Sequence, residues 1–185
     1  MSIEYTIRRR LLSFLHISFD IFDEGGQPIG FCQQKAFKLK EDIRIYTNES
    51  RENERLSIKA RQIIDFSAAY DVFDSKTGEK LGALKRQGWT SLIRDSWIVM
   101  DADDREVGKI TEDSMLMATL RRFFNFIPQS FHMVDQNDNE VATFHGNFNP
   151  FVRKLMVDVQ DDCTLAPMLV LAGGILLMAI EGRQS

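Results

Sequence analysis

Two short stretches of the chain place arginine next to aromatic and aliphatic residues. Arg8, Arg9 and Arg10 are followed by leucines and a phenylalanine, and Arg121 and Arg122 are followed by three phenylalanines within four positions. An anionic membrane surface attracts such segments by roughly 1 kcal/mol per basic residue. We therefore take these five arginines as candidate contacts for anionic lipid. The alternative is that the phenylalanines pack against the fold while the arginines extend into water.

The three histidines do not form an evident metal site. His132 and His145 lie on opposite arms of one expected hairpin, and His16 is distant from both in the sequence. A structural or catalytic metal needs three or four ligands with supporting hydrogen bonds. No cysteine or further histidine lies near this pair, so we interpret all three as ordinary strand residues.

Two acidic segments resemble the start of a calcium-binding loop. In the segment 135–139 the first three ligand positions are present, but Glu140 replaces the required glycine and Gly146 replaces the bidentate glutamate. The segment 101–104 has the same fault. Both fall where a turn is expected, and we interpret their acidic residues as solvent-exposed turn residues. We expect no metal and no cofactor.

Known catalytic signatures are missing from the chain. It contains no GxSxG, HExxH or P-loop motif, and no nucleophile is spaced from a base in a recognisable way. We therefore expect a protein that is not an enzyme. The net charge of −4 argues against nucleic acid as a partner. Two cysteines without a CxxC pair indicate reduced thiols and a cytoplasmic location.

A repeated pattern sets the expected fold. Four segments have an aromatic residue, an apolar pair and then an aspartate that opens a polar turn. An apolar residue returns six or seven positions later and is followed by glycine or alanine, as in a β-hairpin. The small residue either leaves room for a facing aromatic side chain or marks a bulge. The segments are Phe19–Asp23, Tyr70–Asp74, Trp97–Asp101 and Phe131–Asp135.

Further strand-like runs lie between the hairpins. Together with the hairpin arms they predict about twelve strands, a number that favours closure into a barrel because wide open sheets expose their edges. The runs are Ala36–Lys40, Ile43–Asn48, Arg55–Arg61 and Phe151–Val159. One segment departs from this rhythm: residues 114–125 are rich in Met, Leu and Ala and predict a short amphipathic helix that ends before Pro128.

The C-terminal segment predicts an uncharged helix over Leu165–Ile180, with Pro167 in its first turn. It is apolar on every side, so it must be buried in protein or in lipid. Sixteen residues span about 24 Å, less than the roughly 30 Å of a bilayer core. We therefore predict a helix enclosed by the barrel and keep a membrane span as the alternative. Its expected structural residues are Leu165, Leu169, Gly173, Gly174 and Leu177.

These features resemble the tubby C-terminal-like superfamily, which includes the phospholipid scramblases and the LURP-one-related proteins. The bacterial branch is the most similar, through Gly108–Asp113, Leu120–Phe124, Phe148–Phe151 and the run from Leu171 to Gln184. The resemblance covers residues 15–184 and implies a twelve-stranded barrel with the helix through its centre. Tubby proteins bind phosphoinositides on the barrel exterior, but no motif places that site here. The acids Asp158, Asp161 and Asp162 match the scramblase calcium stretch only loosely, so calcium is not carried over.

The sequence thus predicts one mostly-β domain over residues 1–185, a closed antiparallel barrel around a central apolar helix. We expect a non-enzymatic binding or scaffolding module at anionic membrane lipid, cytoplasmic and peripheral to the membrane. Two alternatives stay open: a soluble protein-interaction or structural domain, and a scramblase-like protein that uses 165–180 as a span.

Overall fold

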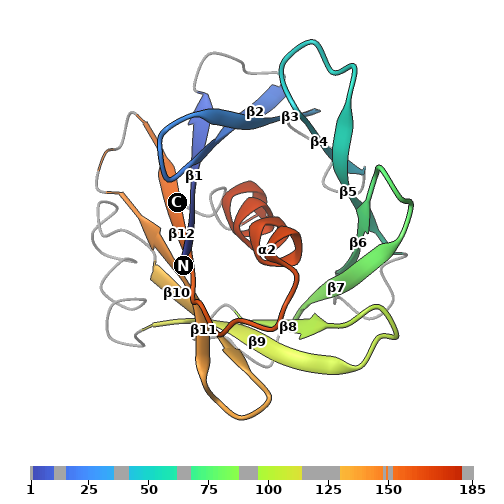
Figure 1. The fold of residues 1–185 in the computed structure, drawn as a ribbon, viewed down its shortest axis with the longest axis vertical. Coiled ribbons are helices and arrows are strands. Elements are labelled where there is room, and N and C mark those ends of the chain that lie inside the picture. The colour runs from blue at the N-terminus through green and yellow to red at the C-terminus, as the bar shows by residue number, and fades with distance from the viewer. Residues whose placement is uncertain are drawn as a thin grey trace.

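The strands of the computed structural model close into a barrel with a helix inside it (Figure 1). The structure describes residues 2–10, 16–35, 42–61, 68–87, 96–113, 130–147, 149 and 152–180. Each strand pairs antiparallel with its neighbours in chain order, and β1 pairs with β12 to complete the ring. The elements are β1 (Ile3–Arg10), β2 (His16–Asp23), β3 (Pro28–Lys35), β4 (Ile43–Tyr46), β5 (Glu54–Ala60), β6 (Ala69–Asp74), β7 (Lys80–Arg86), β8 (Ser96–Met100), β9 (Glu106–Glu112), β10 (Ser130–Asp135), β11 (Glu140–Gly146), β12 (Lys154–Val159) and α2 (Pro167–Ile180).

The predicted hairpin repeat is confirmed, and each copy contains a β-bulge close to its turn. In the copy formed by β2 and β3 the register shifts between Ile21 and Phe22, and the same shift recurs in the other three copies. The small residue marks the bulge: Gly30 pairs with Ile21, and a side chain added at Gly108 would overlap the carbonyl oxygen of Val134. The bulge also occurs between β4 and β5, a fifth copy that lacks the aspartate pattern.

Some of the predicted elements differ from those observed. Strand β1 was not expected, although Ile3, Tyr5 and Ile7 alternate with polar residues as in a half-buried strand. Strand β12 starts at residue 154 rather than 151, and β4 ends at residue 46 rather than 48. The predicted strand 36–40 and the predicted helix 114–125 lie outside the described residues.

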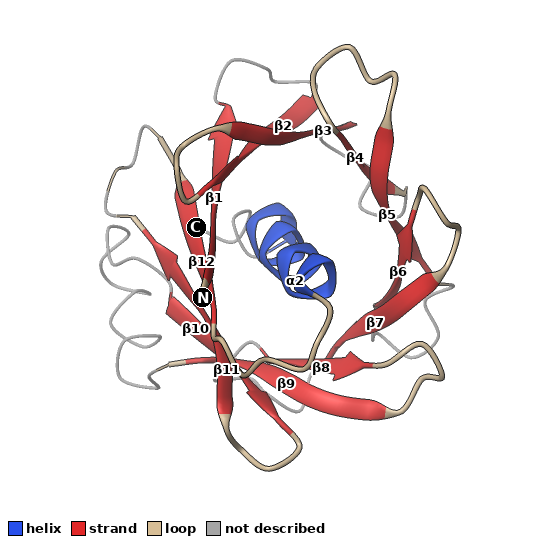
Figure 2. Cartoon of the chain, viewed as in Figure 1, coloured by secondary structure: helices blue, strands red, loops and turns tan. Residues whose placement is uncertain are grey.

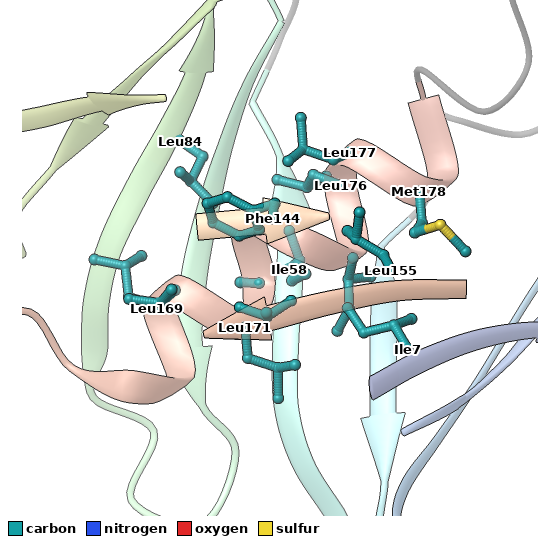
Figure 3. Packing of buried hydrophobic residues seen from close by; sticks show 14 of the residues in the cluster. Ile7, Ile58, Leu84, Phe144, Leu155, Leu169, Leu171, Leu176, Leu177 and Met178 are labelled. Atoms are coloured by element: carbon teal, nitrogen blue, oxygen red, sulfur yellow. The ribbon is translucent and has the colours of Figure 1, made fainter. Parts of the chain in front are cut away.

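Helix α2 lies inside the barrel, as predicted, and side chains from the strands surround it (Figure 2). All residues from 169 to 180 are buried. A Cβ at Gly173 would lie 3.1 Å from Ile110 Cδ1, and one at Gly174 would lie 2.9 Å from Ile7 Cδ1. The two glycines therefore let the helix backbone approach the wall on two sides, and Figure 3 shows the strand side chains that point at it.

The helix starts two residues later than predicted. Leu165 precedes it and is only partly buried against the core, so it is not a residue of the central helix. The chain turns into the helix through the carbonyl of Ala166, which accepts hydrogen bonds from the N–H groups of Leu169 and Val170 at 2.8 and 3.3 Å. Pro167 has no N–H to donate and is tolerated at the first position. Among the described helices, none is long and apolar enough to cross a membrane.

Candidate interaction surface

The interior of the barrel leaves little room for a ligand. A cleft between β2–β5 and the start of α2 has a volume of about 10 Å³, roughly the space for one water molecule. It is lined mainly by aliphatic side chains, together with Arg55. Because α2 fills the centre of the barrel and this cleft is too small for a larger ligand, the outer surface of the described residues is the more accessible place for binding.

The arginine run at the end of β1 is divided between the two faces of the strand. Arg8 and Arg10 point outward and both meet Asp20 of β2, whose side chain is only 8% exposed. Arg10 donates from Nε and Nη2 at 2.9 and 2.5 Å, Arg8 donates from Nη2 at 3.1 Å, and Arg10 also pairs with Glu49. Burial favours the neutral carboxyl, but the two guanidinium groups prevail and hold the pKa of Asp20 below its ordinary value.

Each of these two arginines also lies over an aromatic ring. The guanidinium carbon of Arg8 lies 4.7 Å from the ring centre of Phe22, and that of Arg10 lies 5.1 Å from the ring centre of Phe31. Such cation–π contacts stabilise by about 0.5–1 kcal/mol at exposed sites. Arg9 lies on the other face of the strand because side chains alternate. The predicted cluster of three therefore places only two cations on the outer face.

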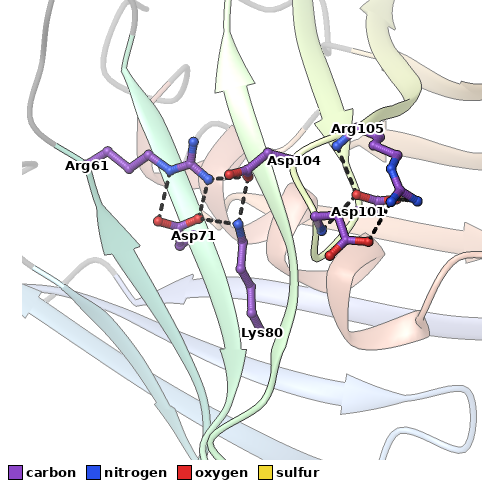
Figure 4. A network of polar contacts seen from close by, with 7 residues as sticks. Arg61, Asp71, Lys80, Asp101, Asp104 and Arg105 are labelled. Carbon is purple, nitrogen blue, oxygen red and sulfur yellow. Dashed lines mark hydrogen bonds and ion pairs between the residues drawn. The ribbon is translucent and has the colours of Figure 1, made fainter.

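A second cluster repeats this arrangement 51 residues later in the chain, on β5 and β6 (Figure 4). Arg61 donates to Asp71 at 2.9 and 2.5 Å, as Arg10 does to Asp20, and also pairs with Asp104. Lys80 completes the network at 3.3 Å from Asp71 and 2.6 Å from Asp104. The bond from Arg61 is the main cause that lowers the pKa of Asp71. Lys59 lies over the ring of Phe73 at 4.7 Å, as Arg8 lies over Phe22.

The third copy, on β9 and β10, exchanges the charges. His132 takes the position of the aspartate and Asp113 takes that of the arginine, with His132 Nδ1 2.7 Å from Asp113 Oδ1. His132 Nε2 lies 2.9 Å from the hydroxyl of Thr111, which pairs with it across the strands. The barrel is thus built from three similar four-stranded units. Each has on its outer face a pair of polar side chains that joins two strands, which we call a clasp: Arg10 with Asp20, Arg61 with Asp71, and Asp113 with His132.

The two ends of the barrel differ in charge. Because neighbouring strands run in opposite directions, the five hairpin turns and the segment 160–166 lie at the end where α2 begins. We call this the turn end, and it comprises these segments and the strand residues next to them. It carries the acids Asp23, Glu24, Glu49, Glu52, Glu54, Asp74, Glu79, Asp101, Asp103, Asp104, Glu106, Asp135, Asp138, Glu140, Asp161 and Asp162 and the bases Arg51, Lys76, Lys80 and Arg105.

The turn end therefore has sixteen acidic and four basic residues. Elsewhere among the residues that the structure describes, seven are acidic and thirteen are basic. A net negative end and a net positive remainder give the molecule a preferred orientation in front of a charged surface. An anionic surface would repel the turn end and attract the other half of the barrel.

The seam between β12 and β1 adds residues that the sequence analysis missed. Lys154 pairs directly with Arg8, and two positions further Met156 pairs with Thr6. Met156 is 41% exposed, and it is one of two large apolar residues at the described surface that are this exposed. Both residues alternate with buried Leu155 and Val157, a period of two that could have revealed an outward-facing lysine and methionine.

Several predicted site residues are not brought together. Arg121 and Arg122 lie outside the described residues. His132 and His145 lie on the predicted hairpin, but His145 contacts Ser130 at 3.4 Å rather than His132. Among the described residues no three His, Cys, Asp or Glu side chains are grouped to hold a metal ion. Both cysteines are free, and burial raises the pKa of Cys32 to about 12.

A family model described as LURP-one-related matches residues 29–173, from the start of β3 to the middle of α2. The chain belongs to the LURP-one-related family. That family is part of the tubby-like C-terminal superfamily. The crystal structure of a protein from Arabidopsis thaliana is similar to this LURP-one-related chain, with 16% sequence identity, a TM-score of 0.58 and coverage of 97% of this chain and 91% of the plant chain. At that identity the likeness shows the fold alone. No curated protein matches the chain.

Proposed function

We propose that this LURP-one-related protein is a non-enzymatic binding module that acts at an anionic lipid surface. The family and the barrel fit a binding or scaffolding role. The interior is filled, and the cleft beside α2 holds no more than a water molecule. We therefore place the binding role on the outer surface. The observation that carries the lipid assignment is the unequal charge of the barrel, which has an acidic turn end and an excess of basic residues elsewhere.

The arginines of β1 support this proposal because they are exposed and yet held in fixed positions. Arg8 and Arg10 are 44% and 40% exposed although both contact Asp20. Their aromatic supports hold the charged groups at the surface, so little side-chain entropy remains to be lost on binding. Arg9, Arg121 and Arg122 stay predicted contacts. We further propose that the protein is cytoplasmic and binds peripherally to the membrane surface.

Sedimentation with lipid vesicles tests the proposal. We expect the wild-type protein to pellet with vesicles that contain phosphatidylserine and to stay in the supernatant with pure phosphatidylcholine. The bound fraction should fall as salt is added, because an exposed electrostatic attraction is screened within about 10 Å at 0.1 M salt. Equal amounts in the two pellets, or protein in neither, would refute a role at anionic lipid.

The second candidate is a protein-interaction or scaffolding domain without a lipid role. The acidic turn end favours it, because sixteen acidic residues at one end suit a basic partner surface. The two functions make opposite predictions for charge reversal. Changing Asp103 to lysine should weaken binding to a basic protein partner, whereas it should leave vesicle binding unchanged or strengthen it.

A further inference from the structure

We propose that the lipid contact is the outer face of the β12–β1 seam, where Lys154, Arg8 and Met156 lie side by side. The inference rests on the proposed function and names the face and the partner: the surface of an anionic phospholipid bilayer. Lys154 and Met156 are its central residues, and both are exposed. Neither belongs to the arginine-rich stretches of the sequence.

The charges at the seam are arranged in an unusual way for a stable sheet. Lys154 and Arg8 are paired directly across the two strands, and like charges in that position destabilise a sheet. Arg8 is compensated by Asp20, but the Lys154 ammonium has no ion-pair partner among the described residues. Two cations separated by one strand spacing can bind the same anionic group. A lipid phosphate or carboxylate would replace the missing partner.

Acidic residues on this face lie toward the turn end. Glu4 and Asp158 pair with each other four residues along from the pair of Arg8 and Lys154. Asp20 lies on the other side of Arg8, is nearly buried and is already engaged by two guanidinium groups. The free positive charge is therefore displaced toward the end of the barrel opposite the acidic turns, which matches the orientation expected at an anionic surface.

The apolar residue next to these cations favours a bilayer over a soluble anion. Met156 lies two residues from Lys154, with Thr6 on one side and His145 on the other. A flexible thioether side chain can enter the boundary between headgroups and acyl chains. A soluble phosphate would contact the cations but would give Met156 no apolar phase to enter. Contact of both residues with one partner therefore favours a lipid surface over a soluble anion.

The test compares single variants in vesicle sedimentation, with thermal unfolding recorded for each protein. Lys154→Glu should reduce partitioning to phosphatidylserine vesicles by about tenfold, since each basic residue contributes about fivefold and the reversal also adds repulsion. Met156→Ala should reduce it by roughly fourfold or more, the contribution of at least one methylene-sized group, whereas Met156→Leu should retain it. Glycerol phosphate should not displace the protein from the vesicles.

Lys85→Glu is the matched control. Lys85 is exposed and lies on β7, across the barrel from the seam (Figure 1). Its substitution by glutamate changes the net charge by the same amount as Lys154→Glu. It should reduce binding by no more than about twofold, the long-range effect of net charge alone. If both lysine variants lose the same amount, or if Met156→Ala binds like wild type, the seam is not the contact although the proposed function stands. If wild-type protein does not bind anionic vesicles, both proposals are refuted.

Discussion

The position of α2 against β1 can be tested through Gly174. A Cβ at this residue would lie 2.9 Å from Ile7 Cδ1, 3.0 Å from Val157 Cγ2 and 3.6 Å from Leu155 Cδ2. Ile7 and Val157 are fully buried, so neither can move into solvent. Gly174→Ala therefore adds a methyl group to a space that is already full, and it tests whether the helix is enclosed at this depth.

Two effects of opposite sign determine the free energy of unfolding of this variant. Alanine is about 1 kcal/mol better than glycine inside a helix. Overpacking a core by one methyl group costs about 1–3 kcal/mol. The nearest atom is the mobile tip of Ile7, but the next belongs to a β-branched valine that has little rotamer freedom. We expect a net destabilisation of about 1 kcal/mol.

Ile7→Val removes the Cδ1 atom that meets the new methyl group. Alone it should destabilise by about 0.5–1.5 kcal/mol, because it leaves a small cavity. In the double variant the alanine occupies part of that cavity, so the two changes together should cost about 1 kcal/mol less than the sum of the single changes. Denaturation in urea, followed by circular dichroism and by fluorescence to check two-state behaviour, measures all four proteins.

The control uses the neighbouring glycine. A Cβ at Gly173 would lie 3.1 Å from Ile110 Cδ1, on a different side of the barrel from Ile7. Gly173→Ala should therefore combine with Ile7→Val additively, within about 0.3–0.5 kcal/mol. If Gly174→Ala is equally additive with Ile7→Val, the helix does not contact β1 as described and is not enclosed by the wall at that point.

Three further outcomes follow from the described contacts. Gly108→Ala should destabilise by about 2 kcal/mol or more in urea denaturation, because its Cβ overlaps a backbone carbonyl, whereas Gly25→Ala should change stability by less than about 0.5 kcal/mol. The pKa of Asp71 is lower in the folded protein than in the unfolded chain, where it is near 4. Its contribution to stability is therefore present above the unfolded pKa and is lost as the pH falls through the lower folded pKa. Asp71→Asn should flatten part of the acid-induced fall in melting temperature. In native protein a thiol reagent should modify Cys163 and spare the fully buried Cys32, and a second equivalent of reaction without denaturant would contradict the described core.

The three clasps show how this barrel controls the outer surface of its strands. In the first two units an arginine reaches an aspartate on the next strand and then an acid from a later turn, Glu49 or Asp104. In the third unit the chain passes from β12 into α2 and thus into the barrel. Exposed Met156 lies on β12 of this third unit, as does Lys154, which has no ion-pair partner in the described part of the chain. The departure from the repeat and the candidate contact surface therefore coincide.

The hairpins and the helix could be predicted because their signals are local. The aspartate at each turn forms its hydrogen bonds within a few residues: Asp135 accepts from the N–H groups of Asn137 and Asn139 at 2.8 and 2.9 Å. The uncharged run before Ile180 has no polar face to leave in water, so its burial follows from composition. Strand β1 is not among the predicted strands, although its alternation is regular; it lacks the aspartate turn that marks the hairpins.

The candidate surface could be predicted only in part. The sequence singled out Arg8 and Arg10 through the apolar residues that follow them. Their observed partners are separated from them in the chain: Asp20 lies ten residues from Arg10, and Glu49 lies 39 residues from it. Lys154 meets Arg8 only because the last strand closes the barrel against the first. No pattern within one segment contains that information.

The sequence by itself determined which segments alternate between core and solvent, where the turns lie, and that the apolar terminal helix needs to be enclosed. These properties follow from side-chain chemistry over a few neighbouring residues. Only the tertiary structure decided which outward charges are neutralised and which remain available. The register of β1 against β2 and β12 gives Arg8 an acid on one side and Lys154 on the other, because pairing between strands sets the distance between charges that the chain itself leaves far apart.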